Sequence, residues 1–126
     1  MTIEKIFDAA AFFVDNIKKE KSKIQKIREF TFDEFYKYTE SIMESSYEVR
    51  KSAVSLMKKS EMGDSIPAKD YWVIRQVFLN EAEEPVNIPD KKDAYFGRIV
   101  YADDIDRNFK EFMGDQKIKT FRINRQ

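Results

Sequence analysis

The 126-residue chain contains neither cysteine nor histidine. Without cysteine it has no disulfide bonds, no thiol nucleophile and no zinc–thiolate site. Without histidine it lacks the commonest general base of enzymes and the commonest protein ligand of transition metals. The acidic segments also lack the alternating ligand spacing and turn glycine of a calcium loop. We therefore predict that the protein is not an enzyme and binds neither a cofactor nor a metal.

Glycine and proline are scarce, and neither charge sign dominates. The three glycines lie far apart, which excludes a glycine-rich phosphate loop. Lys and Arg number 23, as do Asp and Glu, so the whole chain has no net attraction to nucleic acid or anionic membranes. No apolar run is long enough to span a membrane, and the acidic start does not resemble a secretory signal. We expect a cytoplasmic protein without membrane association, and the composition suits a bacterial or phage genome.

Apolar and aromatic residues are abundant enough for one folded domain over residues 1–126. Because Gly and Pro are absent before Gly63, residues 1–63 are predicted to form two long helices, Ile3–Glu29 and Phe32–Met62. Thr31 and Glu34 have capping-box spacing at the start of the second helix. Phe30 before this cap and Phe35 after it have the spacing of a hydrophobic staple. The two helices are expected to form a hairpin that reverses at Phe30–Thr31.

Residues 64–126 are predicted to form a smaller mixed portion. Helical spacing favours a helix over residues 68–83, although Tyr71–Leu79 is rich in β-forming residues and a strand is the alternative. Tyr95–Tyr101 and Lys117–Ile123 are predicted strands that pair antiparallel. A short helix between them is expected to carry Asp103, Asp104 and Asp106 in its first turn. The predicted fold class is α+β and mostly helical, with a long N-terminal helical hairpin packed on a two-stranded antiparallel sheet and a short helix.

Exposed aromatic residues point to a protein interface. The apolar arc of the predicted second helix covers about half its circumference, more than the ~100° that one packing contact requires. Aromatic side chains are enriched at interface hot spots. We predict a small binding protein, acting as an adaptor, inhibitor or regulatory subunit, and the same wide arc makes a homo-oligomer a further expectation. The candidate partner-binding residues are Phe12, Tyr36, Tyr47 and Val54.

Two basic segments support an alternative function as a nucleic-acid-binding regulator. Ile17–Phe30 carries six basic residues against two acidic ones, and Asp115–Gln126 carries four against one. Clustered cations of this kind contact phosphates. The candidate nucleic-acid-binding residues are Lys18, Lys19, Lys23, Lys26, Lys117, Lys119, Arg122 and Arg125. No helix-turn-helix, zinc finger or RNP-type motif accompanies them, so the sequence favours the protein partner.

Overall fold

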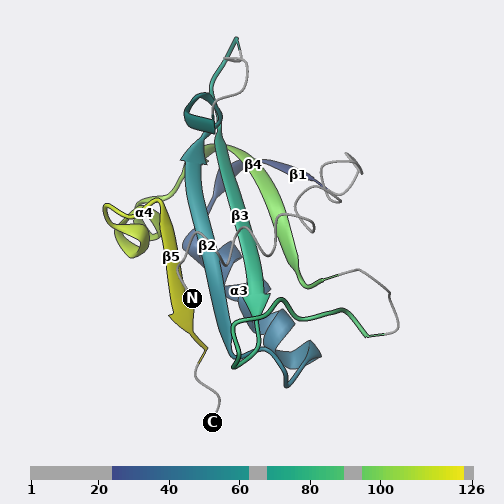
Figure 1. Ribbon diagram of the computed structural model, residues 1–126. Helices are drawn as coiled ribbons and strands as arrows, with labels where there is room; N and C mark the ends of the chain where they lie inside the picture. Colours follow the sequence, from purple (N-terminus) through teal and green to yellow (C-terminus); the bar gives the residue numbers. More distant parts are fainter. Residues whose placement is uncertain (1–23, 63–67, 90–94, 124–126) are drawn as a thin grey trace.

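The computed structural model describes residues 24–62, 68–89 and 95–123. The elements in these ranges are β1 (Gln25–Phe30), α3 (Phe32–Ser45), β2 (Lys51–Lys58), the 3-10 helix η2 (Lys59–Met62), β3 (Trp72–Leu79), β4 (Gly97–Ile105), α4 (Arg107–Met113) and β5 (Ile118–Arg122). The five strands form one sheet in the order β1-β4-β3-β2-β5 (Figure 1). β1 runs parallel to β4, and every other neighbouring pair is antiparallel.

The structure contradicts the predicted helical hairpin. The end of the predicted first helix is the edge strand β1, and residues 3–23 of that prediction lie outside the described ranges. The second helix was predicted over Phe32–Met62, but the observed helix α3 ends at Ser45. The rest of the predicted range includes strand β2. The four residues at 52–55 are all buried, because β2 lies between β3 and β5 and is covered on both faces. A strand that is buried on both faces does not alternate apolar and polar residues. Its continuous apolar run has the same sequence pattern as a buried helix with a wide apolar arc.

The predicted helix over residues 68–83 is also wrong, since this segment contains β3. Six of the eight residues of β3 are buried, and β-branched and aromatic side chains predominate in it. Such residues pack well on a pleated surface, and here that preference outweighs the helical spacing of the apolar positions. The fold is therefore a mixed five-stranded sheet that carries two α-helices within the described ranges, rather than a mostly helical protein.

The two predicted C-terminal strands exist as β4 and β5, but they do not pair with each other. β4 lies between β1 and β3, whereas β5 pairs with β2. Asp103 and Asp104 belong to β4 instead of the first turn of the following helix. The helix begins after Asp106, the N-cap residue, whose side chain accepts a hydrogen bond from the Phe109 N–H. Which strands pair depends on contacts between residues far apart in the sequence. The local sequence pattern of each strand carries no information about these contacts.

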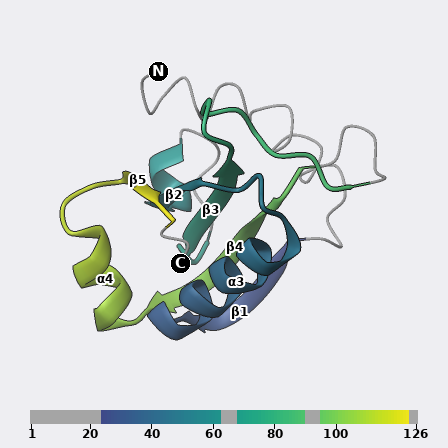
Figure 2. The same ribbon diagram turned by 90° about the horizontal axis from the view of Figure 1, so that it is seen from below.

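Both α-helices pack on the same face of the sheet (Figure 2). Thr31 caps α3 as predicted, and its hydroxyl accepts a hydrogen bond from the Glu34 N–H at 3.0 Å. The core under the helices includes Phe30, Phe35 and Phe109, with ring centroids 4.9 Å apart for Phe30–Phe109 and 5.1 Å apart for Phe35–Phe109. A second buried cluster lies on the opposite face of the sheet, because its residues alternate along the strands with those under the helices. It consists of Ala53, Val73, Val77, Leu79 and Ile99. The helix-bearing face is where the aromatic residues gather.

Candidate functional site

A hollow of about 330 Å³ opens between α3, α4 and β5. We call it the aromatic hollow because most of its wall is apolar and aromatic. The wall includes Phe32, Phe35, Tyr36 and Met43 from α3, Phe112 from α4 and Phe121 from β5. A concave apolar surface with a few polar groups at its rim is the usual form of a binding site.

Phe112 joins the three elements around the aromatic hollow. Its ring centroid lies 5.5 Å from that of Phe32, 5.2 Å from that of Phe35 and 5.8 Å from that of Phe121. The Lys119 ammonium lies 4.1 Å from the centre of the Phe112 ring and donates a hydrogen bond to the Phe112 carbonyl at 2.6 Å. Aromatic contacts and a cation–π contact therefore fix α4 against β5.

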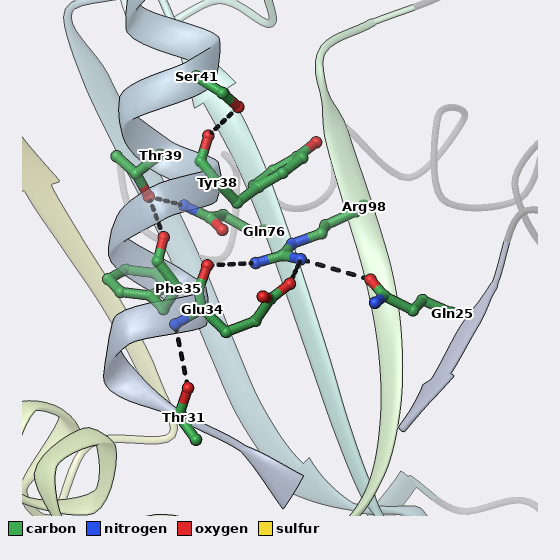
Figure 3. Close-up of polar contacts among 9 residues, drawn as sticks. All are labelled: Gln25, Thr31, Glu34, Phe35, Tyr38, Thr39, Ser41, Gln76 and Arg98. Carbon is green, nitrogen blue, oxygen red and sulfur yellow. Dashed lines mark hydrogen bonds and ion pairs between the residues drawn. The ribbon is translucent and has the colours of Figure 1, made fainter. Parts of the chain in front are cut away.

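Arg98 of β4 anchors α3 to the sheet (Figure 3). Its Nη1 atom donates to Glu34 Oε1 at 3.0 Å, and its Nη2 atom donates to the Glu34 carbonyl at 3.4 Å. The guanidinium lies 3.9 Å from the centre of the Tyr38 ring. Burial lowers the pKa of Arg98, and the Glu34 contact opposes this effect. Burial also raises the pKa of Tyr38 to about 12, against the opposing influence of the Arg98 charge.

Gln76 of β3 provides a second polar anchor for α3. Its Nε2 atom donates to Thr39 Oγ1 at 2.9 Å and to Ser52 Oγ at 3.2 Å. Thr39 in turn donates to the Phe35 carbonyl at 2.9 Å (Figure 3). Two polar contacts from different strands thus set the rotation of α3 about its axis. We interpret Arg98 and Gln76 as positioning residues, which direct Tyr36 toward solvent at the rim of the aromatic hollow.

The four predicted partner-binding residues have different positions. Tyr36 is 55% exposed and lines the aromatic hollow. Tyr47 is 82% exposed, but it lies in the turn after α3 and does not line the hollow. Val54 is fully buried in β2, so its side chain has no surface to offer a partner, and that prediction is corrected. Phe12 lies outside the described residues.

The predicted basic residues do not form one surface. Lys26 is on β1, at one edge of the sheet, whereas Lys119 and Arg122 are on β5, at the opposite edge. Lys117, just before β5, pairs with Glu61, and Arg122 pairs with Glu81. Lys18, Lys19, Lys23 and Arg125 lie outside the described residues. The nucleic-acid hypothesis required the basic residues of Ile17–Phe30 and of Asp115–Gln126 to form one patch. The described basic residues of these two segments lie at opposite edges of the sheet and do not form it.

The sequence did not predict that β5 is an edge strand among the described strands. The Lys117 carbonyl accepts from the Leu56 N–H, and the Ile123 N–H donates to the Arg50 carbonyl. In an antiparallel pair such bonds recur at every second residue, so Ile118, Thr120 and Arg122 turn their backbone N–H and C=O groups away from β2. Within the described residues β5 has β2 as its sole neighbouring strand. A local pattern does not reveal this edge, because it depends on which strand β5 pairs with.

Neither known proteins nor recognisable metal or membrane features identify a function for this chain. No protein-family model, curated protein or solved structure matches the chain. Among the described residues, no group of three or more acidic side chains is placed to hold a metal ion. None of the helices in these ranges combines the length and apolar character needed to cross a membrane. The aromatic hollow and the β5 edge are therefore the features from which we infer a function.

Proposed function

We propose that the protein is a non-enzymatic binding protein whose partner is another protein. The partner presents an extended segment that pairs with β5 and places an apolar side chain in the aromatic hollow. One observation carries this proposal: the aromatic hollow lies beside a sheet edge whose outward backbone groups face no strand among the described residues. Addition of a strand to an exposed edge is a recurring mode of peptide recognition.

Strand geometry supports this combination. An added strand lies about 4.8 Å from β5, and its alternate side chains face the same side of the sheet about 6.6 Å apart. Phe121 of β5 lines the aromatic hollow, so the helix-bearing face is the one on which the hollow opens. Main-chain hydrogen bonds to Ile118, Thr120 and Arg122 supply affinity. The hollow supplies specificity, because it selects an apolar side chain at one position.

The charged residues on and next to β5 are not placed to prevent another strand from pairing with it. Lysine on an edge strand normally discourages pairing with another chain. Here Lys117 contacts Glu61, Lys119 contacts the Phe112 carbonyl, and Arg122 contacts Glu81. Each cation is engaged by another group of the same chain. Among the described residues, these cations therefore leave the outward backbone groups of β5 without a charged side chain against them.

Peptide selection tests the proposal. We expect a random peptide library selected against the full chain to yield extended peptides with alternating apolar residues. Tyr36→Ala should weaken their binding at least about tenfold, a hot-spot effect. Tyr47→Ala is the matched control, because it removes an aromatic ring exposed elsewhere and should leave affinity unchanged. Peptides that bind the Tyr36 variant as tightly as the natural protein would exclude the aromatic hollow.

Hydrogen exchange tests strand addition separately from the hollow. The amides of Ile118, Thr120 and Arg122 should exchange rapidly in the free protein and become protected when a selected peptide binds. Thr120→Pro should abolish binding with little loss of stability, because this N–H points away from β2. Unprotected amides in the complex would exclude strand addition. A mass twice 15.0 kDa by light scattering, together with β5 amides that are already protected in the free protein, would assign the edge to a second copy instead.

A further inference from the structure

A second hollow, of about 540 Å³, lies at the other edge of the sheet. We call it the basic hollow, because Lys26 and Arg28 of β1 line it together with Tyr71, Tyr101 and Asp103. Tyr71 and Tyr101 pack against the Ala53 cluster, whereas the two α-helices pack on the other core cluster. The basic hollow is therefore separate from the aromatic hollow and from the β5 edge.

Two cations stand side by side on the exposed strand β1. Lys26 and Arg28 are both exposed and occupy alternate positions, so their side chains project to the same side about 6.6 Å apart. Lys26 is in register with Tyr101 of β4. No ion pair joins either cation to an acidic side chain within the described ranges.

Two tyrosine rings lie beside these cations. The centroids of Tyr71 and Tyr101 are 5.0 Å apart, and their planes are inclined by 47°. Both rings are partly buried, so the structure supports them while leaving part of their surface accessible. Aromatic rings next to a cationic strand form the stacking platform and electrostatic track of proteins that bind single-stranded nucleic acids.

We propose that the basic hollow binds single-stranded nucleic acid. Lys26 and Arg28 contact successive phosphates, and a base stacks against the tyrosine pair. The Asp103 carboxylate accepts a hydrogen bond from an amino group of the base or from a ribose hydroxyl. This site uses neither β5 nor the C-terminal cations, so it differs from the joint surface expected from the sequence. It is also independent of the proposed protein-binding function.

Fluorescence anisotropy with the full chain and a labelled oligothymidylate of about 12 nucleotides tests the cations. Affinity should fall between about 50 and 200 mM salt, because binding releases counterions. Lys26→Gln combined with Arg28→Gln should weaken binding and reduce the slope of log K against log salt by about 1.4. The matched control is Lys37→Gln combined with Lys110→Gln, which removes the same charge from α3 and α4 and should leave the slope unchanged. No binding at low salt, or an equal loss in the control, would overturn the site.

Tyrosine variants test the stacking contact. Tyr71→Leu should weaken binding about 5- to 100-fold, whereas Tyr71→Phe keeps the ring and should retain affinity. Melting temperatures of both variants show whether a loss of binding reflects unfolding, and a folded Tyr71→Leu variant with full affinity would overturn the stacking contact. Inorganic polyphosphate, which has no bases, should compete much less well than the oligonucleotide. Equal competition by polyphosphate, by double-stranded DNA or by a mononucleotide would overturn single-stranded nucleic acid as the ligand.

Discussion

Tyr38 makes the stability of the protein sensitive to alkaline pH. Burial raises the pKa of its hydroxyl to about 12 in the folded protein, from an ordinary value of 10.0. Below pH 10 the hydroxyl is neutral in both the folded and the unfolded chain, and its contribution to stability is complete. Between pH 10 and 12 the unfolded chain ionises first, so this contribution falls as the pH rises.

We predict that Tyr38→Phe removes this part of the pH dependence. Between pH 9 and 11 the natural protein should lose about 1.4 kcal/mol more free energy of unfolding than the variant. Urea unfolding of both proteins at the two pH values measures the difference. Because the other titrating groups are common to both proteins, parallel losses would show that Tyr38 ionises equally in both states.

Asp106 supports the starts of both described α-helices. Its carboxylate accepts hydrogen bonds from the Phe109 N–H at 2.8 Å and from the Phe32 N–H at 3.1–3.2 Å. Removal of the carboxylate takes away the N-cap of α4 and leaves the partly buried Phe32 N–H without its partner. Each of these losses should destabilise the fold. We predict that Asp106→Ala lowers the free energy of unfolding by about 2–3 kcal/mol.

Asp106→Asn is the matched variant for this prediction, because its amide oxygen can still accept from a backbone N–H. It should cost less than about 1 kcal/mol, since Asn is as good an N-cap as Asp. Urea unfolding at neutral pH gives both values. Equal stabilities of the Ala variant and the natural protein would show that water replaces both hydrogen bonds.

At the scale of elements, Phe112 links α3, α4 and β5 around the aromatic hollow. We predict that Phe112→Ala costs about 2–4 kcal/mol, because truncation of a large packed ring removes buried area and leaves a cavity. Phe112→Leu retains much of the volume and should cost less than half as much. Urea unfolding of the two variants checks the order. Similar losses for Ala and Leu would indicate that the aromatic contacts, rather than the volume, fix α4.

The start of α3 was predictable from sequence, and its end was not. The Thr31 cap is a contact within three residues, so it is present in the local pattern. The end at Ser45 follows from the burial of β2 between β3 and β5, which depends on residues far along the chain. Of the candidate site, Tyr36 was predictable as an exposed aromatic residue. Phe121 was not, because the pairing of β5 with β2 places it beside α3.

At the scale of the molecule, contacts distant in sequence dominate the sheet. Gln25 of β1 pairs with Val100 of β4, 75 positions later, and Ser52 of β2 pairs with Phe121 of β5, 69 positions later. Loop closure over such separations slows folding. We predict a folding rate of about 1–1000 s⁻¹ in water, typical of domains with many non-local pairings. The single tryptophan, Trp72 of β3, is the reporter for stopped-flow fluorescence, and microsecond folding would contradict the prediction.

The pairing of β1 with β4 also bears on how the protein is made. A ribosome adds about 5–20 residues per second, so β1 waits about 4–15 s after its own synthesis before its partner residue is translated. β2 and β3, which pair antiparallel in the sheet, are both translated before β4, so theirs is the first strand pair for which both partners are present on the nascent chain. β5 is translated after both, so the proposed peptide-binding edge is the last described strand to appear. A growing chain therefore has no complete docking edge until β5 has been translated, which delays capture of the partner until the other described strands are available.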